Sequence, residues 1–213
     1  MASGSNLTPE EIAEVEAANG LRQFDLGLEM IRYFLDPERP FSLRTSHIRE
    51  LQKVAVQGLE ADAGEWRSGK VRIEKSRHTP PEPHLVPSLC QEMCDYVNNN
   101  WHERTPFHLS AYVMWRINWI HPFSEGNGRT SRIVSYVLLC TALGYELPGS
   151  PSIPQQIQEN RGGYFSALEA ADAAYRRNSE VDVTSMEEAI KNMLARQLLS
   201  VIEAGSGIGG VQD

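Results

Sequence analysis

The sequence predicts a mainly α-helical single domain with one short β-hairpin. Apolar residues recur at helical spacing along most of the 213-residue chain. By contrast, Val71 and Ile73 alternate with charged neighbours, which is typical of a short strand or hairpin. With 41% apolar residues the chain can bury one sizeable core, so residues 7–203 are predicted to form a single domain.

The helices follow from local signals taken in chain order. Thr8-Pro9-Glu10-Glu11 combines a cap, an early proline and acidic residues, and predicts a helix from about residue 8 to 34. Residues 43–59 read as a second helix, whereas Pro80, Pro81 and Pro83 prevent one. Helical spacing then resumes in six segments: 86–99, 106–120, from about 127 to Gly144, 154–159, 162–176 and 184–203.

The two ends of the chain are expected to carry no function. Residues 1–6 begin with Met-Ala-Ser-Gly-Ser, which resembles a remnant of an expression vector, and the glycine-rich residues 204–213 are expected to be disordered. The cysteines Cys90, Cys94 and Cys140 lack the spacing of a zinc site and are interpreted as buried thiols. Trp115 and Trp119, four residues apart, are expected to pack in the core.

Charge and hydropathy exclude several classes of partner. The net charge is −8 and no basic stripe is visible, which argues against nucleic acid as the main partner. We find no apolar run of about 20 residues and no secretory signal pattern. The sequence therefore predicts a cytoplasmic protein without a membrane segment, and it is compatible with a homo-oligomer.

The stretch from His121 to Arg132, His-Pro-Phe-Ser-Glu-Gly-Asn-Gly-Arg-Thr-Ser-Arg, is the densest set of reactive groups. Pro122 favours an extended conformation at His121, so a helix ending near Ile120 should give way to a loop. A new helix should begin near Asn127, with its free amide groups facing that loop as an anion site. The loop would thus bring together a base, a carboxylate, two glycines and two arginines.

From the residues alone, each part of this stretch also has a structural interpretation. The glycines could form either a phosphate-binding nest or a simple tight turn. Arg129 could pair with Glu125 on the helix surface, and a single histidine such as His121 is more often structural than catalytic. The clustering favours the functional interpretation, because an isolated ion pair requires neither the histidine nor the glycines.

The stretch resembles the signature of Fic domains, H-x-F-x-[D/E]-G-N-G-R-x-x-R, with every defining position filled and Glu125 in place of the commoner Asp. The resemblance extends from the N-terminal helix to Arg177. It implies a Fic-type helical bundle with a β-hairpin flap over the active site. It also implies a protein adenylyltransferase, which moves AMP from ATP to a Ser, Thr or Tyr hydroxyl of a target protein, itself included.

The resemblance assigns roles residue by residue. His121 would be the general base, and Glu125 would hold Mg²⁺. The ATP phosphates would contact the following residues of the signature: Gly126, Asn127, Gly128, Arg129 and Arg132. Glycine at 128 favours AMP transfer over a kinase-like relative with lysine there.

Two further regions carry roles in Fic domains. The residues Val71, Arg72, Ile73, Arg77 and His78 would lie in a flap that pairs with an extended target segment, although an ordinary surface hairpin is the alternative and Arg77 and His78 could face solvent. Asn160 and Tyr164 fall where the family contacts adenosine, and Tyr164 could equally be a core residue.

The sequence departs from the family at an inhibitory motif, [S/T]-x-x-x-E-[G/N], whose glutamate pairs with the second arginine of the signature. Here Ala18 precedes Asn19 where that glutamate is expected, and Glu14 stands at the Ser/Thr position. We hypothesise that Arg132 has lost its restraint and that the enzyme is derepressed; alternatively, Glu16 or a partner protein supplies the carboxylate. The domain could also be a silent nucleotide-binding module, or a Fic enzyme that transfers another phosphate-containing group or removes AMP.

Overall fold

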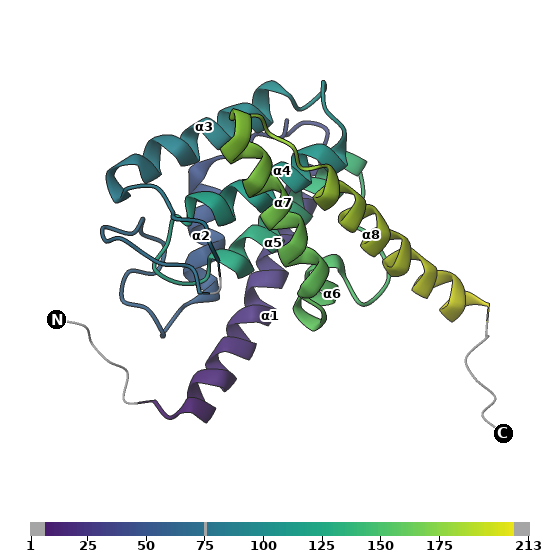
Figure 1. Ribbon diagram of the computed structural model, residues 1–213. Coiled ribbons are helices and arrows are strands. Elements are labelled where there is room, and N and C mark those ends of the chain that lie inside the picture. The colour runs from purple at the N-terminus through teal and green to yellow at the C-terminus, as the bar shows by residue number, and fades with distance from the viewer. Residues whose placement is uncertain (1–6, 75, 207–213) are drawn as a thin grey trace.

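The computed structural model describes residues 7–74 and 76–206, which form eight α-helices and one 3₁₀ helix (Figure 1). In chain order these are α1 (Pro9–Phe34), α2 (Thr45–Ala55), η1 (Pro83–Leu85), α3 (Val86–Asn99), α4 (Pro106–Ile120), α5 (Asn127–Leu143), α6 (Ile153–Glu159), α7 (Gly162–Asn178) and α8 (Thr184–Gly205). Each predicted helix is present, and α3 and α4 have the predicted bounds. The capping box predicted at Thr8 is also confirmed, because Thr8 and Glu11 bond to each other's backbone amides.

Helices α4 and α5 form the centre of the molecule. They pack on each other more extensively than any other pair, and both are buried over most of their length. A helix that is apolar on all sides must be covered on all sides. Accordingly, α1 and α2 pack on α5, whereas α3, α7 and α8 pack on α4.

Helix α1 approaches α5 closely at Gly27. A Cβ atom at this position would lie 2.7 Å from Cδ1 of Ile133, so only glycine fits without movement of the neighbour. Gln23 adds a buried hydrogen bond to the carbonyl of Leu51 in α2. Beyond this crossing, the N-terminal end of α1 projects from the body of the molecule, as does the C-terminal end of α8 (Figure 1).

The three cysteines are buried, as predicted. Burial raises the pKa of Cys90 and Cys94 to about 12 and that of Cys140 to about 11, so all three remain thiols near neutral pH. Trp115 is also buried and packs against Trp119, with 6.4 Å between the ring centroids. The prediction is confirmed for Trp115, whereas Trp119 is partly buried and packs against the core.

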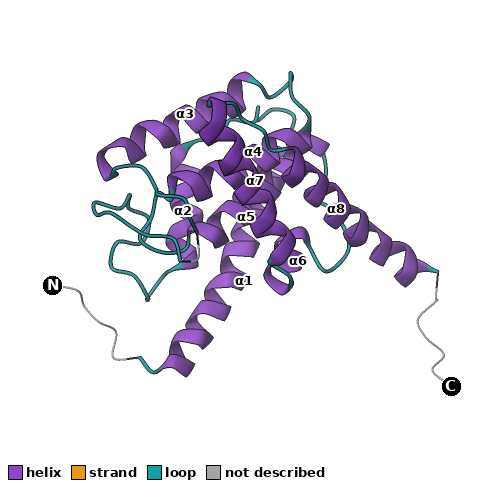
Figure 2. Ribbon diagram, viewed as in Figure 1, coloured by secondary structure: helices purple, strands orange, loops and turns teal. Residues whose placement is uncertain are grey.

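The predicted β-hairpin is not found. Within the described residues, the segment from 68 to 82 is an irregular loop without a strand, and Figure 2 shows only helices and loops. Alternation of two apolar residues was too short a pattern, because a hairpin needs a paired strand as well as one extended segment. At the chain ends, α8 continues to Gly205, into the predicted tail; residues 1–6 and 207–213 lie outside the described residues.

Candidate active site

His121 lies at the end of α4, but its backbone is not extended as predicted. Its φ and ψ angles are 51° and 60°, in the left-handed region, and its N–H bonds to the carbonyl of Ile117 as a helix cap. Non-glycine residues rarely adopt this conformation, so neighbouring contacts must stabilise it. The helix cap has therefore overridden the bias that Pro122 imposes on the residue before it.

The imidazole of His121 is neutral and has a defined tautomer. Burial lowers its pKa to about 4, and the positive charges of Arg67 and His78 act in the same direction, against a backbone hydrogen bond to Asn118. Nδ1 lies 3.3 Å from the carbonyl oxygen of Asn118. Since a carbonyl can only accept, Nδ1 carries the proton and Nε2 keeps a free lone pair.

Asn118, one turn before His121, ties three helices together. Its Nδ2 atom contacts the hydroxyl of Ser131 in α5 at 2.8 Å and the hydroxyl of Tyr164 in α7 at 2.9 Å. Tyr164 is only 4% exposed. The structure therefore shows Tyr164 as a core residue whose ring is not open to an adenine, and its hydroxyl helps to position the site.

Arg132 is a buried cation next to the loop. It is 9% exposed and, within the described residues, forms no ion pair with a carboxylate. Its pKa is lowered, first by burial and then by the positive charges of Arg161 and Arg129, with Tyr164 opposing the shift. A buried guanidinium among like charges is costly unless an anion binds there.

Arg129 is held between two other helices. Its Nη1 atom donates to the carbonyl of Ala55 at 3.0 Å, and its Nη2 atom lies 3.3 Å from a carboxylate oxygen of Glu16 in α1. Its ion-pair partner in the described residues is thus Glu16 and not Glu125, the neighbour considered from helical spacing. Arg161, which precedes α7, is a third positive group near Arg132 that the sequence reasoning had not selected.

The loop is shaped from inside by Asn127, the first residue of α5. Its side chain accepts from the N–H of Phe123 and donates to the carbonyl of Phe123, at 3.0 and 2.9 Å. Phe123 itself is fully buried, as expected of an anchor. Because the side chain of Asn127 is engaged in this way, the groups left for an anion are the backbone amides in the first turn of α5.

The two glycines of the loop have different constraints. Gly126 has a positive φ of 80°, and a Cβ atom there would lie 2.9 Å from Val56. Gly128 lies next to Arg132, since its Cβ position would be 3.4 Å from Nη1 of that residue. A Cβ atom at 128 would therefore touch the buried guanidinium without a clash, and only a longer side chain could crowd it.

Acidic residues also lie beside the loop. Glu125 is exposed, and its backbone carbonyl is held by Gln52 at 3.0 Å. Burial raises the pKa of Glu60, and the negative charges of Glu125 and Asp62 raise it further, so these carboxylates interact electrostatically. Mg²⁺ commonly uses one or two carboxylates together with substrate phosphates, and this arrangement fits such a site.

No complete metal site is present within residues 7–74 and 76–206, where no cluster of three His, Cys, Asp or Glu side chains could hold a metal. In the same residues, no helix combines the length and the apolar character that a membrane span requires. A surface hollow of about 640 Å³ near the C-terminal end of α7 is lined by three alanines and three charged residues, and none of them belongs to the loop.

Sequence reasoning missed Arg67, which joins the predicted flap to the end of α4. Its guanidinium is 3% exposed and donates to backbone carbonyls only. The acceptors are the oxygens of Pro81 at 2.6 Å, His121 at 2.7 Å, Gly69 at 3.0 Å and Ile120 at 3.3 Å. The backbone N–H of Arg67 also bonds to Pro122 at 2.9 Å. Arg67 thereby stabilises the left-handed conformation of His121; a single arginine in a loop gave no signal of this in the sequence.

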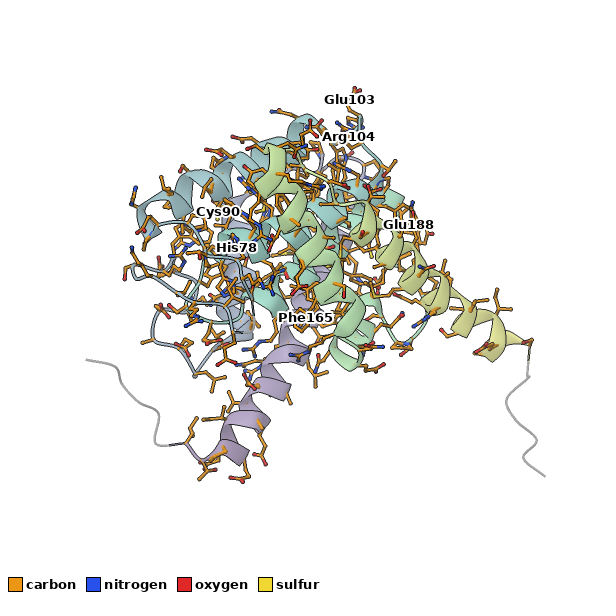
Figure 3. The ribbon with its side chains drawn as sticks, viewed as in Figure 1. His78, Cys90, Glu103, Arg104, Phe165 and Glu188 are labelled. Carbon is orange, nitrogen blue, oxygen red and sulfur yellow. The ribbon has the colours of Figure 1, made fainter. Side chains whose placement is uncertain are left out.

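The flap residues divide into anchored and exposed ones. His78, which is labelled in Figure 3, is half-buried. Its Nε2 atom lies 2.7 Å from the carbonyl oxygen of Trp119 in α4. It therefore faces the protein and not a target. Arg72 and Arg77 are exposed, and Val71 and Ile73 are partly buried.

The remaining predicted residues lie at the edges of the site. Asn19 is buried and links α1 to the end of α2 through the carbonyl of Gln57, whereas Ala18 is exposed on the same helix. Asn160 is exposed at the end of α6, where its side chain accepts from the N–H of Gly162 at 3.3 Å.

Comparisons with known proteins identify the fold. Residues 42–139 match the profile of the Fic/DOC family. Protein adenylyltransferase Fic of Drosophila willistoni is 28% identical over 160 residues, which is 74% of this chain and 30% of that protein. The relative of the same name from Drosophila yakuba is 29% identical over 157 residues, 72% of this chain and 30% of its own length. The chain thus spans about a third of the length of these relatives.

Solved structures show the same architecture. A Fic domain-containing signaling protein from Bacteroides thetaiotaomicron superposes with a TM-score of 0.72 at 21% identity, covering 95% of this chain and 76% of that one. Fic-1 from C. elegans superposes with a TM-score of 0.69 at 18% identity, covering 97% and 61%. Together with the loop from His121 to Arg132, these comparisons show that the chain has the fold of Fic domains and that its residues 42–139 match the Fic/DOC family.

Proposed function

We propose that this domain transfers AMP from ATP to a hydroxyl group of a protein. The match of residues 42–139 to the Fic/DOC family and the names of the Drosophila relatives support a nucleotidyltransferase. The observation that carries the proposal is the pairing of a neutral histidine with a buried, uncompensated arginine across one short loop. A binding site for anions alone would not require His121 with its free Nε2.

The proton transfer follows from the tautomer of His121. With Nδ1–H bonded to Asn118, Nε2 can take the proton of an incoming hydroxyl. The hydroxyl oxygen would then form a bond to the α-phosphorus of ATP, and the bond from that phosphorus to the bridging oxygen would break. Pyrophosphate would leave with the electron pair of that bond, and the products balance as AMP-protein and pyrophosphate.

The positive groups would stabilise the leaving pyrophosphate. Arg132, Arg129 and Arg161 lie close enough for their charges to interact, and the first turn of α5 adds backbone donors. Preorganised donors of this kind contribute roughly 3 kcal/mol each in favourable cases. Binding of the phosphates would also supply the anion that buried Arg132 lacks.

Mg²⁺ would be held by Glu125, with Asp62 and Glu60 nearby, and when bound it would neutralise charge on the phosphates. The contribution of this chain is then to place those carboxylates beside the loop. Gln52 positions Glu125 through its backbone carbonyl, which leaves the carboxylate free.

We propose that α1 regulates the site, though not through the glutamate typical of the family. Ala18 cannot restrain Arg132, and within the described residues no other carboxylate does so. Glu16, however, occupies Arg129 at 3.3 Å. Arg132 would thus be free to bind phosphate, whereas Arg129 would bind it only after ATP displaces the carboxylate of Glu16.

Intact-mass measurement after incubation with ATP and Mg²⁺ tests the proposal, first on the protein alone and then with candidate targets. We expect a gain of one AMP unit that is lost in His121→Ala and kept in His102→Ala, a matched change at an exposed histidine. A gain that survives His121→Ala would refute the assigned base.

Two measurements distinguish a silent nucleotide-binding module from a transferase. One is calorimetric titration with ATP and Mg²⁺, and the other is an assay of pyrophosphate release. Binding that needs Arg132, with no release of pyrophosphate in the presence of protein substrates, would favour the module. Release of pyrophosphate that needs both Arg132 and His121 would favour the transferase.

A further inference from the structure

The loop predicted as a flap is strongly basic in an acidic protein. Between residues 67 and 78 the sequence contains five Lys or Arg residues and one Glu, whereas the whole chain has a net charge of −8. Local charge opposite in sign to that of the whole molecule is a property of recognition surfaces, because it attracts a complementary partner.

Both ends of this segment are attached to the same end of α4. Arg67, at its beginning, bonds to the carbonyls of Ile120 and His121, and His78, near its end, bonds to the carbonyl of Trp119. The loop between these anchors is therefore held beside His121 before any target binds. Binding to a preorganised segment costs less conformational entropy than binding to a free loop.

Among the flap cations that the structure describes, two are left for a partner. The guanidinium of Arg67 is buried, and Lys70 pairs with Glu82 at 2.7 Å. Arg72 and Arg77 are exposed and, within the part of the chain that the structure describes, have no carboxylate at ion-pair distance.

These cations are separate from the phosphate-binding arginines. Arg129 belongs to α5 and Arg132 lies one turn further along the same helix, whereas the flap is attached to the end of α4 that carries His121. The flap thus borders the base, where the acceptor hydroxyl must enter. We infer that Arg72 and Arg77 select a target segment with acidic residues flanking that hydroxyl. This inference rests on the proposed function and specifies the class of its protein substrate.

The expected effect is moderate. An exposed ion pair contributes ~0.2–1 kcal/mol, and two pairs that are reversed from attraction to repulsion should change affinity at least about fivefold. The effect should shrink as salt is added, because the Debye length falls to about 8 Å at physiological ionic strength.

The test measures binding without turnover. The probes are two fluorescein-labelled peptides, each with one central serine. Asp and Glu flank the serine in the acidic peptide, and Asn and Gly flank it in the neutral peptide. Fluorescence anisotropy gives the dissociation constant of each peptide. The full chain is compared with the double variant Arg72→Glu, Arg77→Glu. The control is Arg104→Glu, Arg196→Glu, which has the same charge change at exposed residues outside the flap; Arg104 is labelled in Figure 3.

We expect the acidic peptide to bind more tightly than the neutral one, with at least a fivefold loss in the flap variant and none in the control. Equal binding of the two peptides, or equal losses in both variants, would overturn the inference. Tighter binding of a single-stranded oligonucleotide than of the acidic peptide would also overturn it. Because no turnover is measured, a failed AMP-transfer assay beside intact peptide selectivity would count against the proposed function only.

Discussion

Replacement of Arg67 by methionine should both destabilise the protein and release the flap. The change keeps much of the apolar stem and removes the guanidinium, which donates to four backbone carbonyls from the flap and from the end of α4. Those carbonyls would be left without a donor in a site that is 3% exposed at Arg67. Buried acceptors without partners carry a desolvation cost.

The magnitude can be worked from these contacts. Hydrogen bonds to a charged group contribute ~1.5–3 kcal/mol each, so four would total roughly 6–12 kcal/mol before costs are counted. Burying the guanidinium costs several kcal/mol, and burial lowers the pKa of Arg67, which reflects that cost. We expect a net loss of ~3–5 kcal/mol, a large share of the ~5–15 kcal/mol that stabilises a typical domain.

Urea unfolding measures the global loss, and limited trypsin digestion measures the local one. We expect faster cleavage after Arg72 and Arg77 in Arg67→Met, because the flap loses its anchor. Arg67→Lys should be intermediate, since an ammonium group cannot reach four acceptors at once. The control Arg49→Met removes a partly exposed arginine bonded to Gly64 and Glu65 and should cost less than Arg67→Met, at about 1 kcal/mol.

A loss of under 1 kcal/mol in Arg67→Met, with unchanged cleavage of the flap, would refute this reasoning. It would mean that water satisfies the carbonyls and that the flap is held by other contacts. A global loss without faster cleavage would limit the role of Arg67 to stability.

Three further predictions concern the loop and its neighbours. Glu16→Ala should lower KM for ATP about two- to fivefold, because it frees Arg129 for the phosphates. Glu14→Ala, a nearby change at an exposed residue, should leave KM unchanged. If steady-state kinetics give the same KM for both variants, Glu16 has no regulatory role. Gly126→Ala should lower the free energy of unfolding, measured with urea, by ~2–4 kcal/mol, because Gly126 has a positive φ and a Cβ atom there would clash with Val56 at the end of α2. Gly163→Ala should raise it by ~0.5–1 kcal/mol, because Gly163 lies in a helix with open space around its Cβ position. In NMR titrations assigned with His121→Gln, the imidazole should titrate near pH 4. Because the ordinary pKa of histidine is near 6.5, the unfolded state binds more protons than the folded state between pH 4 and pH 6.5. The contribution of neutral His121 to stability is therefore complete above pH 6.5 and is lost as the pH falls towards 4. A titration midpoint at 6.5 would contradict the burial of the imidazole.

The helices were predictable because their signals are local. Apolar spacing identified each one, and the caps at Thr8 and Gly144 lie where the sequence predicted them. The order of reactive groups from His121 to Arg132 was predictable for the same reason, since twelve adjacent residues can occupy only one loop and the helix start that follows.

Predictions failed where distant contacts decide conformation. His121 is left-handed because a helix cap and Arg67 stabilise it, and Arg67 lies more than fifty positions earlier in the chain. The expected hairpin is an irregular loop because its polar backbone atoms bond to Arg67 and its His78 side chain bonds to the end of α4, in place of a partner strand. Tyr164 is a core residue because α4 and α5 offer its hydroxyl two partners.

By itself, the sequence determined the helical architecture, the family signature and the chemical groups available for phosphate binding and proton transfer, because periodicity and a contiguous motif are local properties. Only the tertiary structure decided which charges meet. It left Arg132 buried without a carboxylate in the described residues, placed Glu16 on Arg129 and lowered the pKa of His121. The physical reason is that ion pairing, desolvation and backbone strain depend on neighbours in space, and these come from helices far apart in the chain.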